Sequence, residues 1–349
     1  MAAAATTTWL DRIRRSGVIN LLGYTLVGLV GFWLLVNLIK EPTEFINVAL
    51  IGLTNGAIYG LVALGYTLVY GILQLINFAH GDVFALSGLV ASTVIVDVIG
   101  LDRNSSVLAI VAGMTFTLVF IMTMFALVNA TIELVAYRRL RRAPRLAALI
   151  TAVGMSFIVQ NISLALYGVG FHSIPNFVPR SEVIGIGDVT YSWNKLAVLL
   201  ITVPVLILLT WFVRETKQGK AMRAVAQDTE ASAMMGINVN RTISVTFAIA
   251  GALAGSAAIV YLLQFNMRYD TGFELGLIAF TAAVLGGIGN LSGAVLGALL
   301  IGFVQAFNEG LTWMTPGSDW TRTIVFGILI LILVFRPEGL LGERTPEGA

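Results

Sequence analysis

The topology of this chain depends on GLTNGAIYGLVALGYTLVYGILQLINFAHGD, residues 52–82. Its first part belongs to an apolar run at 45–74, which would form a helix about 45 Å long at roughly 1.5 Å per residue. That length exceeds the hydrocarbon core of a bilayer, about 30 Å. Asn55-Gly56 and three further glycines could divide the run into two short pieces. The number of times this run crosses a membrane therefore sets the side on which every later loop lies.

The rest of the chain is equally apolar. Of its 349 residues, 57% are hydrophobic and 11% are charged, whereas a soluble domain carries about 25% charged residues. The fold class is therefore all-α, a polytopic integral membrane protein with about ten transmembrane helices. The short alternating segments of a membrane β-barrel are not seen. The ten apolar runs lie at 17–39, 45–74, 81–100, 106–135, 147–168, 195–213, 242–264, 273–289, 293–313 and 322–335.

Basic residues predict the orientation, because cytoplasmic loops are enriched in Lys and Arg. With the N-terminus inside and one crossing for each run, 15 of the 21 Lys and Arg residues lie inside. If the 45–74 run crossed twice, Arg138–Arg145 would face outside, against this rule. We therefore expect both termini to be cytoplasmic and the 45–74 run to cross once, either bent or partly re-entrant.

The same reading divides the chain. Residues 1–16 form a cytoplasmic basic leader, residues 17–336 the transmembrane domain, and residues 337–349 a cytoplasmic tail. The apolar run at 17–39 is too long for the core of a signal peptide, and no small-x-small cleavage site follows it. We therefore read that run as a retained membrane helix.

Several kinds of chemistry have no support in the sequence. There is no cysteine, and the two histidines, His80 and His172, are far apart, so a metal cluster is not expected. No GxxxxGK[ST] motif is present to hold a nucleotide phosphate, and no nucleophile elbow is found. We expect neither an enzyme nor a bound cofactor in this chain.

The densest polar cluster within the apolar part is INFAHGD, residues 76–82. Asn77 and His80 would share a helix face, and Gly81 could break the helix there. Three readings stay open: a hydrogen-bonded turn, the lining of a substrate pathway, and a proton relay at His80. Asn55 is a further pathway candidate.

Other polar residues in the runs are expected to form hydrogen bonds between helices. Asp97 and Glu133 lie near helix ends, where a carboxylate can reach water, so we assign them no special role. The remaining candidates for such hydrogen bonds are Gln160, Asn161, Gln264, Gln305, Asn308 and Glu309.

One polar segment, Arg214–Arg241, interrupts the apolar sequence, and we call it the coupling segment. Its central part predicts two short amphipathic helices, the second capped by Asp228 and ended by Gly236. Met234 and Met235 offer adaptable apolar contacts. The segment is predicted either to lie on anionic lipid or to insert into a partner protein. On the other side, the loop 168–194 contains two prolines after Phe171, which argues against a long helix.

Three stretches carry a resemblance to a known family. Residues 52–82, AFTAAVLGGIGNLSGAVLGALLIG at 279–302, and GKAMRAVAQDTEASAMMGINVNR at 219–241 resemble branched-chain amino acid permeases of the LivH type. EASAMMG at 230–236 is similar to the Glu-Ala-Ala-x-x-x-Gly loop of ABC importer permeases, with Ser232 replacing the second alanine. The Leu-Pro pair that ends this loop in the family is missing, and the helix at 17–39 is an addition to the shortest members.

The resemblance covers residues 45–340 and implies one membrane subunit of an ATP-driven importer in a bacterial or archaeal plasma membrane. It implies a second related permease, two cytoplasmic ATPase subunits that bind ATP and Mg, and an extracytoplasmic binding protein. The residues implied in coupling to the ATPases are Arg223, Asp228, Glu230, Ala231 and Gly236. The pathway candidates are Asn55, Asn77, His80 and Asp82.

Other functions remain open on the sequence alone. A permease of the same family for urea, amides or other small polar solutes fits the same residues. An ion-coupled secondary transporter would use His80, Asp82 or Glu309 and would not need the coupling segment. A structural membrane scaffold fits the composition but leaves the polar cluster unexplained.

Overall fold

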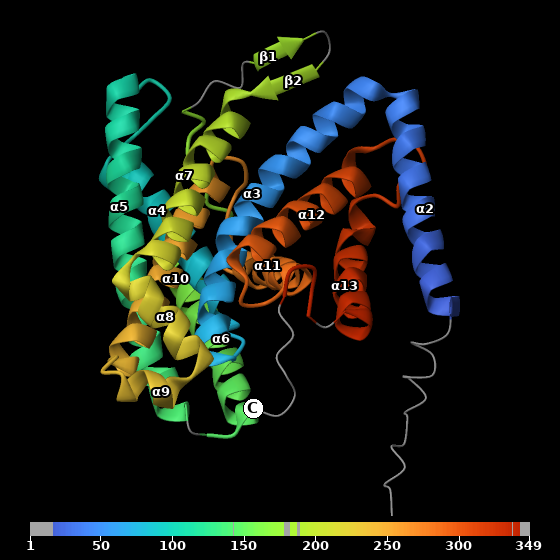
Figure 1. The fold of residues 1–349 in the computed structure, drawn as a ribbon. Helices are drawn as coiled ribbons and strands as arrows, with labels where there is room; N and C mark the ends of the chain where they lie inside the picture. The colour runs from blue at the N-terminus through green and yellow to red at the C-terminus, as the bar shows by residue number, and fades with distance from the viewer. Residues whose placement is uncertain (1–16, 142, 178–181, 187–188, 337, 343–349) are drawn as a thin grey trace, which may run out of the picture.

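The computed structural model describes residues 17–141, 143–177, 182–186, 189–336 and 338–342. The leader expected at 1–16 and the end of the tail, 343–349, lie outside the described residues. Each of the ten expected runs forms a helix, as Figure 1 shows. The helices of these runs are α2 (Gly17–Lys40), α3 (Pro42–Leu73), α4 (Ala79–Thr93), α5 (Val107–Ile132), α6 (Arg145–Tyr167), α7 (Trp193–Glu215), α10 (Val239–Leu262), α11 (Thr271–Gly286), α12 (Leu291–Gly310) and α13 (Ser318–Phe335).

Within the described part of the chain, nine helices are long and apolar enough to cross a membrane. The tenth, α11, has 16 residues and would measure about 24 Å, less than the hydrocarbon core. Helices α3, α4 and α10 are mostly buried and form the centre of the bundle, whereas α5, α6, α7 and α13 expose most of their apolar side chains. This is the arrangement expected of a polytopic membrane protein, in which outer helices contact lipid.

Helix α3 is continuous over 32 residues, so the 45–74 run forms one helix that could cross a membrane once, and the partly re-entrant alternative is wrong. Figure 1 shows it running obliquely through the bundle, and a tilted helix can be longer than the membrane is thick. Its glycines provide close packing in place of flexibility. A Cβ added at Gly302 of α12 would collide with the backbone of Gly52 and Gly56 in α3. The α3–α12 crossing thus brings two backbones into direct contact.

The chain reverses after α3 at residues 74–78, before the position expected. Gln74 ends α3 in the left-handed conformation, with φ of 52°, and α4 begins at Ala79. Gly81 therefore lies inside α4, and the expectation that it breaks the helix is wrong. Its role is contact, because a Cβ there would collide with the carbonyl oxygen of Gly272 in α11.

Helix α2 stands apart from the bundle and touches it mainly at one end (Figure 1). The Trp33 indole donates a hydrogen bond to the carbonyl oxygen of Trp313 at 3.0 Å, and the Asn37 amide contacts the same residue. The Lys40 ammonium lies 4.8 Å from the Trp313 ring centroid. The run at 17–39 is thus a helix, as expected for a retained membrane segment.

The described residues of the loop after α6 form a hairpin of β1 (Glu182–Ile186) and β2 (Val189–Ser192) and contain no long helix, as predicted. The hairpin attaches to α3, because the hydroxyls of Tyr191 and Thr54 are 3.0 Å apart and buried. Figure 1 shows the hairpin at one end of the bundle and the short helices α8 (Lys217–Gln227) and α9 (Thr229–Met234) near the other.

Candidate functional site

The polar cluster of Asn77, His80 and Asp82 lies at the reversal between α3 and α4. The side chains of all three residues are buried, with at most 2% of each residue exposed. The Tyr137 hydroxyl donates to Asn77 Oδ1 at 2.7 Å, and the Ser156 hydroxyl donates to an Asp82 carboxylate oxygen. Tyr137, from the turn that follows α5, and Ser156, from the middle of α6, therefore hold the cluster in place.

Other polar atoms of the same cluster have no hydrogen-bond partner among the described residues. They are Asn77 Nδ2, His80 Nδ1, His80 Nε2 and Asp82 Oδ1. The His80 ring packs edge-on against Tyr66, with ring centroids 4.8 Å apart. Unpaired buried polar groups are costly, so they need either water or a change of conformation that gives them partners.

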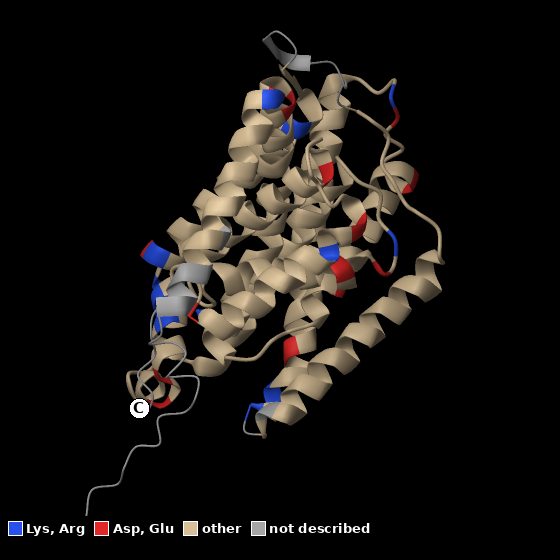
Figure 2. Cartoon of the chain, turned by 90° about the vertical axis from the view of Figure 1, so that its right-hand side faces the viewer, with Lys and Arg blue, Asp and Glu red and all other residues tan. Residues whose placement is uncertain are grey.

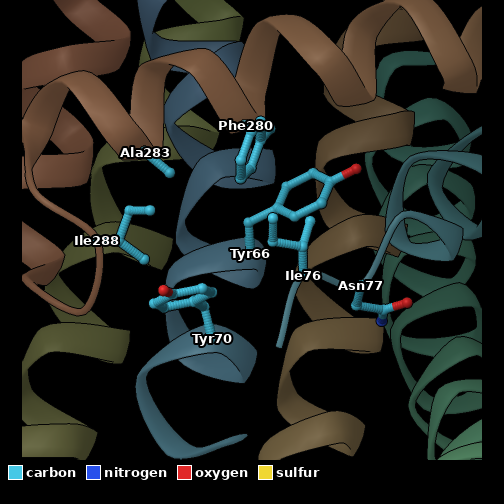
Figure 3. Close-up of a pocket in the computed structure, with 7 residues that line it drawn as sticks. All are labelled: Tyr66, Tyr70, Ile76, Asn77, Phe280, Ala283 and Ile288. Atoms are coloured by element: carbon cyan, nitrogen blue, oxygen red, sulfur yellow. The ribbon is translucent and has the colours of Figure 1, made fainter. Parts of the chain in front are cut away.

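A small cavity lies beside this cluster (Figure 3). It is formed by Tyr66 and Tyr70 from α3 and by Phe280 and Ala283 from α11, with Asn77 at one side. Its volume of about 10 Å³ is enough for about one water molecule. The cluster is therefore closed to a solute of amino acid size in this conformation.

Asn55 does not join the cluster. It is buried on α3, ten residues before Gly65, and it is Gly65 that packs against the His80 ring. Ten helical residues span about 15 Å, so these pathway candidates occupy two levels of the bundle.

The coupling segment forms the two short helices that the sequence predicts. Asp228 Oδ1 accepts hydrogen bonds from the backbone N–H groups of Glu230 and Ala231, both at 2.9 Å. Gly236 ends the second helix with φ of +82°, the left-handed conformation that favours glycine. The first of the two helices, α8, was expected to start after Gly219. It begins at Lys217, because the Thr216 hydroxyl caps it by accepting a hydrogen bond from the Gly219 N–H at 3.0 Å.

Helix α8 is tightly joined to the end of α7. The Arg223 guanidinium donates to the carbonyl oxygens of Val213 and Arg214, which are otherwise unpaired at a helix C-terminus. A Cβ at Gly219 would collide with the backbone of Val213. Arg223 thus joins α8 to the end of α7, a helix long enough to span a membrane.

The far end of the segment is open to contact. Met234 and Met235 are each 83% exposed, and the Glu230 side chain is exposed in the same helix. Ala231 is half-buried. In contrast, Met222 and Val225 of α8 are buried against the bundle. The segment therefore presents an apolar tip on a base that is fixed to the bundle.

The sequence reasoning missed a buried ion network at Glu133. Glu133 is fully buried in a π-helical turn (Glu133–Tyr137) that extends α5, so the expectation that its carboxylate reaches water is wrong. It accepts from Ser244 at 2.6 Å and pairs with Arg138 and Arg141. Burial lowers the pKa of Arg141, although the adjacent Glu133 carboxylate raises it. The sequence signal that could have predicted this network is an acidic residue, Glu133, followed closely by an arginine-rich run that begins at Arg138.

The expectations for Asp97 and for hydrogen bonds between helices are confirmed in part. Asp97 is exposed, as expected. Three of the residues form hydrogen bonds between helices: Gln305 accepts from Tyr59 of α3, the Asn308 amide donates to Thr321 of α13 at 2.9 Å, and Glu309 accepts from Thr321 at 2.9 Å. The expectation is wrong for Asn161, whose amide donates to the Phe157 carbonyl within α6, and Gln264 Nε2 has no hydrogen-bond partner among the described residues. Among the residues that the structure describes, no three His, Asp or Glu side chains are grouped as a metal would require.

Comparison with known proteins identifies the family. The family model described as branched-chain amino acid transport system / permease component matches residues 48–334. This chain is a member of that permease family. The permease is 38% identical over 300 residues to the high-affinity branched-chain amino acid transport system permease protein BraD of Pseudomonas aeruginosa, which covers 85% of this chain and 95% of BraD.

Two further relatives extend the comparison. LivH of Escherichia coli K12, a high-affinity branched-chain amino acid transport system permease protein, is 34% identical over 301 residues, with 85% of this chain and 95% of LivH covered. The ribose import permease protein RbsC of the same organism is 25% identical over 299 residues, 81% of this chain and 83% of RbsC. The permease is thus a multi-pass protein of the plasma membrane, and α2 lies before the family match.

Among solved structures, PsaBC from Streptococcus pneumoniae in complex with Fab covers 83% of this chain and 98% of that chain. The sequence identity is 15% and the TM-score is 0.27, which is too low to show a shared fold.

The buried cluster yields a first prediction. Asn77→Ala and His80→Ala should each lower uptake by the reconstituted transporter, because each removes a polar group of the cluster. The complex should still assemble, because the backbone contacts between the helices are unchanged. Tyr137→Phe, which removes only the hydrogen bond to Asn77 Oδ1, is the milder control. Wild-type uptake in both alanine variants would reduce the cluster to a turn, and failed assembly of both would make it structural.

Proposed function

We propose that this permease is one of two related membrane subunits of an ATP-driven importer that carries branched-chain amino acids into the cell. The observation that carries the proposal is the family match over residues 48–334. The relatives at 34–38% identity are named for branched-chain amino acids, which favours these solutes over urea, amides or ribose.

The coupling segment supports a docking role for two cytoplasmic ATPase subunits, which would bind ATP and Mg in place of this chain. Its apolar tip at Met234 and Met235 is exposed on helices that are fixed to α7 through Arg223. A helix that only lies on lipid would not need this rigid attachment. In this proposal, closure of the ATPase dimer displaces α8 and α9, and the closely packed membrane helices change between two arrangements.

The orientation follows from the same proposal. Both termini and the coupling segment would be cytoplasmic, and the β1–β2 hairpin would face the external binding protein. Its attachment through Tyr191 to Thr54 connects this outer surface to α3, the long central helix. The Asn55, Asn77, His80 and Asp82 side chains then lie along or next to α3, and we propose them as pathway residues.

The test is uptake of labelled leucine by proteoliposomes that contain the permease, its partner permease, the ATPases and the binding protein. We expect uptake that requires ATP and loaded binding protein and that persists when proton and sodium gradients are collapsed. Urea and ribose, supplied at the same concentration, serve as control solutes. Uptake that follows an ion gradient without ATP would overturn the proposal in favour of a secondary transporter.

A further inference from the structure

A group of polar side chains lies on one outer face of the chain, formed by α3, α11, α12 and α13. Its members, which we call the polar strip, are Tyr59, Glu274, Gln305, Glu309 and Arg322. The Arg322 guanidinium donates two hydrogen bonds to the Glu274 carboxylate, at 2.7 and 2.8 Å. The Tyr59 hydroxyl donates to Gln305, whose amide donates to Glu309. The Thr321 hydroxyl, next to Arg322 in α13, donates to Glu309 at 2.9 Å, which joins the two parts.

The ion pair of this strip lies deep in the membrane. Gly272, two residues before Glu274, packs against the backbone of Gly81 and Asp82. Asp82 in turn accepts a hydrogen bond from Ser156, which lies eleven residues from each end of α6. Eleven residues span about 16 Å, so this level is near the middle of the bilayer. Figure 2 shows that acidic and basic residues do occur at mid-height of the molecule, away from its ends.

Unlike the cluster at Asn77, the charged members of the strip are open to their surroundings, although Tyr59 is buried. The side chains of Arg322 and Glu274 are 70% and 47% exposed, and Glu309 is exposed at the last turn of α12. A charged pair in contact with hydrocarbon is costly, and such residues normally face a protein interior or a water-filled cavity. The face that carries the strip therefore cannot be a lipid-facing surface of the assembled transporter.

We propose that the polar strip lines a water-filled path between this permease and its partner subunit, and that the Glu274–Arg322 pair contacts the charged groups of a passing amino acid. The inference rests on the proposed function and names residues for its substrate path. An amino acid carries both an ammonium and a carboxylate group, and the strip offers a carboxylate and a guanidinium side by side. A guanidinium binds a carboxylate through two hydrogen bonds, so Arg322 can exchange one carboxylate partner for another.

The strip and the buried cluster differ in their access to a solute. The cavity beside Asn77 holds about one water, so a solute reaches that cluster only after the helices move. The strip needs no such opening in this conformation. Glu309, in the last turn of α12, accepts a hydrogen bond at 2.9 Å from Thr321, the residue before Arg322, so these members of the strip lie next to each other.

Thiol labelling tests the path directly, because the chain has no cysteine of its own. The variant Glu274→Cys, in the complete reconstituted complex, is treated with a small, water-soluble, cationic methanethiosulfonate, and labelling of this chain is measured by mass spectrometry. Val119→Cys is the matched control, since Val119 is 59% exposed near the middle of α5. Labelling at 274 should be about tenfold faster or more, because the reactive thiolate forms in water and not in hydrocarbon.

A second probe, Glu309→Cys, keeps the test valid if loss of the ion pair prevents assembly of the first variant. Equal, slow labelling at 274, 309 and 119 would overturn the proposal and leave the strip in a dry subunit interface. This readout does not depend on the solute. The proposed path can therefore be disproved independently of the proposed function, which is disproved if the unmodified complex does not take up leucine.

Recognition of the solute by the Glu274–Arg322 pair is tested by a separate measurement, the leucine concentration at half-maximal uptake. Glu274→Gln and Arg322→Gln should each raise the leucine concentration at half-maximal uptake by about tenfold, as expected for loss of a charged contact of roughly 1.4 kcal/mol. Thr323→Ala, at the exposed neighbouring position of α13, is the control and should leave it unchanged. Unaltered half-saturation in both charge variants, in complexes that assemble normally, would overturn the role assigned to the pair.

Discussion

Replacing Gly236 with valine is expected to abolish most leucine uptake and to remove the stimulation of ATPase activity by loaded binding protein. Gly236 has φ of +82°, and a β-branched residue in this region is destabilised by about 1–3 kcal/mol. No atom lies within 4 Å of a Cβ at this position, so the effect arises from the backbone and not from a collision. The strain would change the angle at which α9 presents Met234 and Met235.

The matched control is Gly236→Asn, because asparagine tolerates the left-handed conformation better than other non-glycine residues. It should keep most of both activities. Uptake and ATPase hydrolysis are measured on the same proteoliposomes. If valine leaves full uptake and full stimulation, the geometry of this segment does not matter for coupling, and the lipid-surface reading becomes the better one.

The largest effect on stability is expected at the crossing of α3 and α12. Leucine at Gly302 would force apart two helices whose backbones touch, because its Cβ alone collides with Gly52 and Gly56. Overpacking of this kind costs about 1–3 kcal/mol, and more when a backbone must move. We expect most of the Gly302→Leu protein to aggregate on extraction and the remainder to unfold at a lower temperature.

Gly327→Leu on α13 is the control for that substitution. Nothing lies within 4 Å of a Cβ at Gly327, so its leucine variant should be extracted and unfold like the wild type. Size-exclusion chromatography and thermal unfolding in detergent measure both variants. Equal behaviour of the two variants would show that the α3–α12 contact can widen without loss of the fold.

The features that the sequence predicted correctly are local ones. Ten apolar runs gave ten helices, because the length and composition of a membrane helix are contained in its own residues. The Asp228 cap and the Gly236 ending were predicted for the same reason, since each depends on residues within a few positions. Both features belong to the coupling segment, so the structure of that segment could be predicted from its sequence.

The features that were missed depend on distant residues or on irregular turns. Tyr137 and Ser156, which hold Asn77 and Asp82, are 60 and 74 positions away in the chain. Gly81 and Gly272, which contact each other, are even further apart in the sequence. Gly81 was therefore interpreted as a helix breaker, although it is needed for packing. Glu133 was misjudged because a π-helical turn rotates its carboxylate into the bundle, toward Ser244.

Cross-linking of the coupling segment would show whether a cytoplasmic ATPase subunit binds α8 and α9. Met234→Cys provides a single reactive thiol in this cysteine-free chain, at a side chain that is 83% exposed. The complete complex is treated with a short heterobifunctional thiol-to-amine reagent, and the adducts are identified by mass spectrometry. The account predicts an adduct between this chain and an ATPase subunit. A complex with full transport activity in which position 234 reacts only with free reagent or lipid, and never with the ATPase, would contradict it.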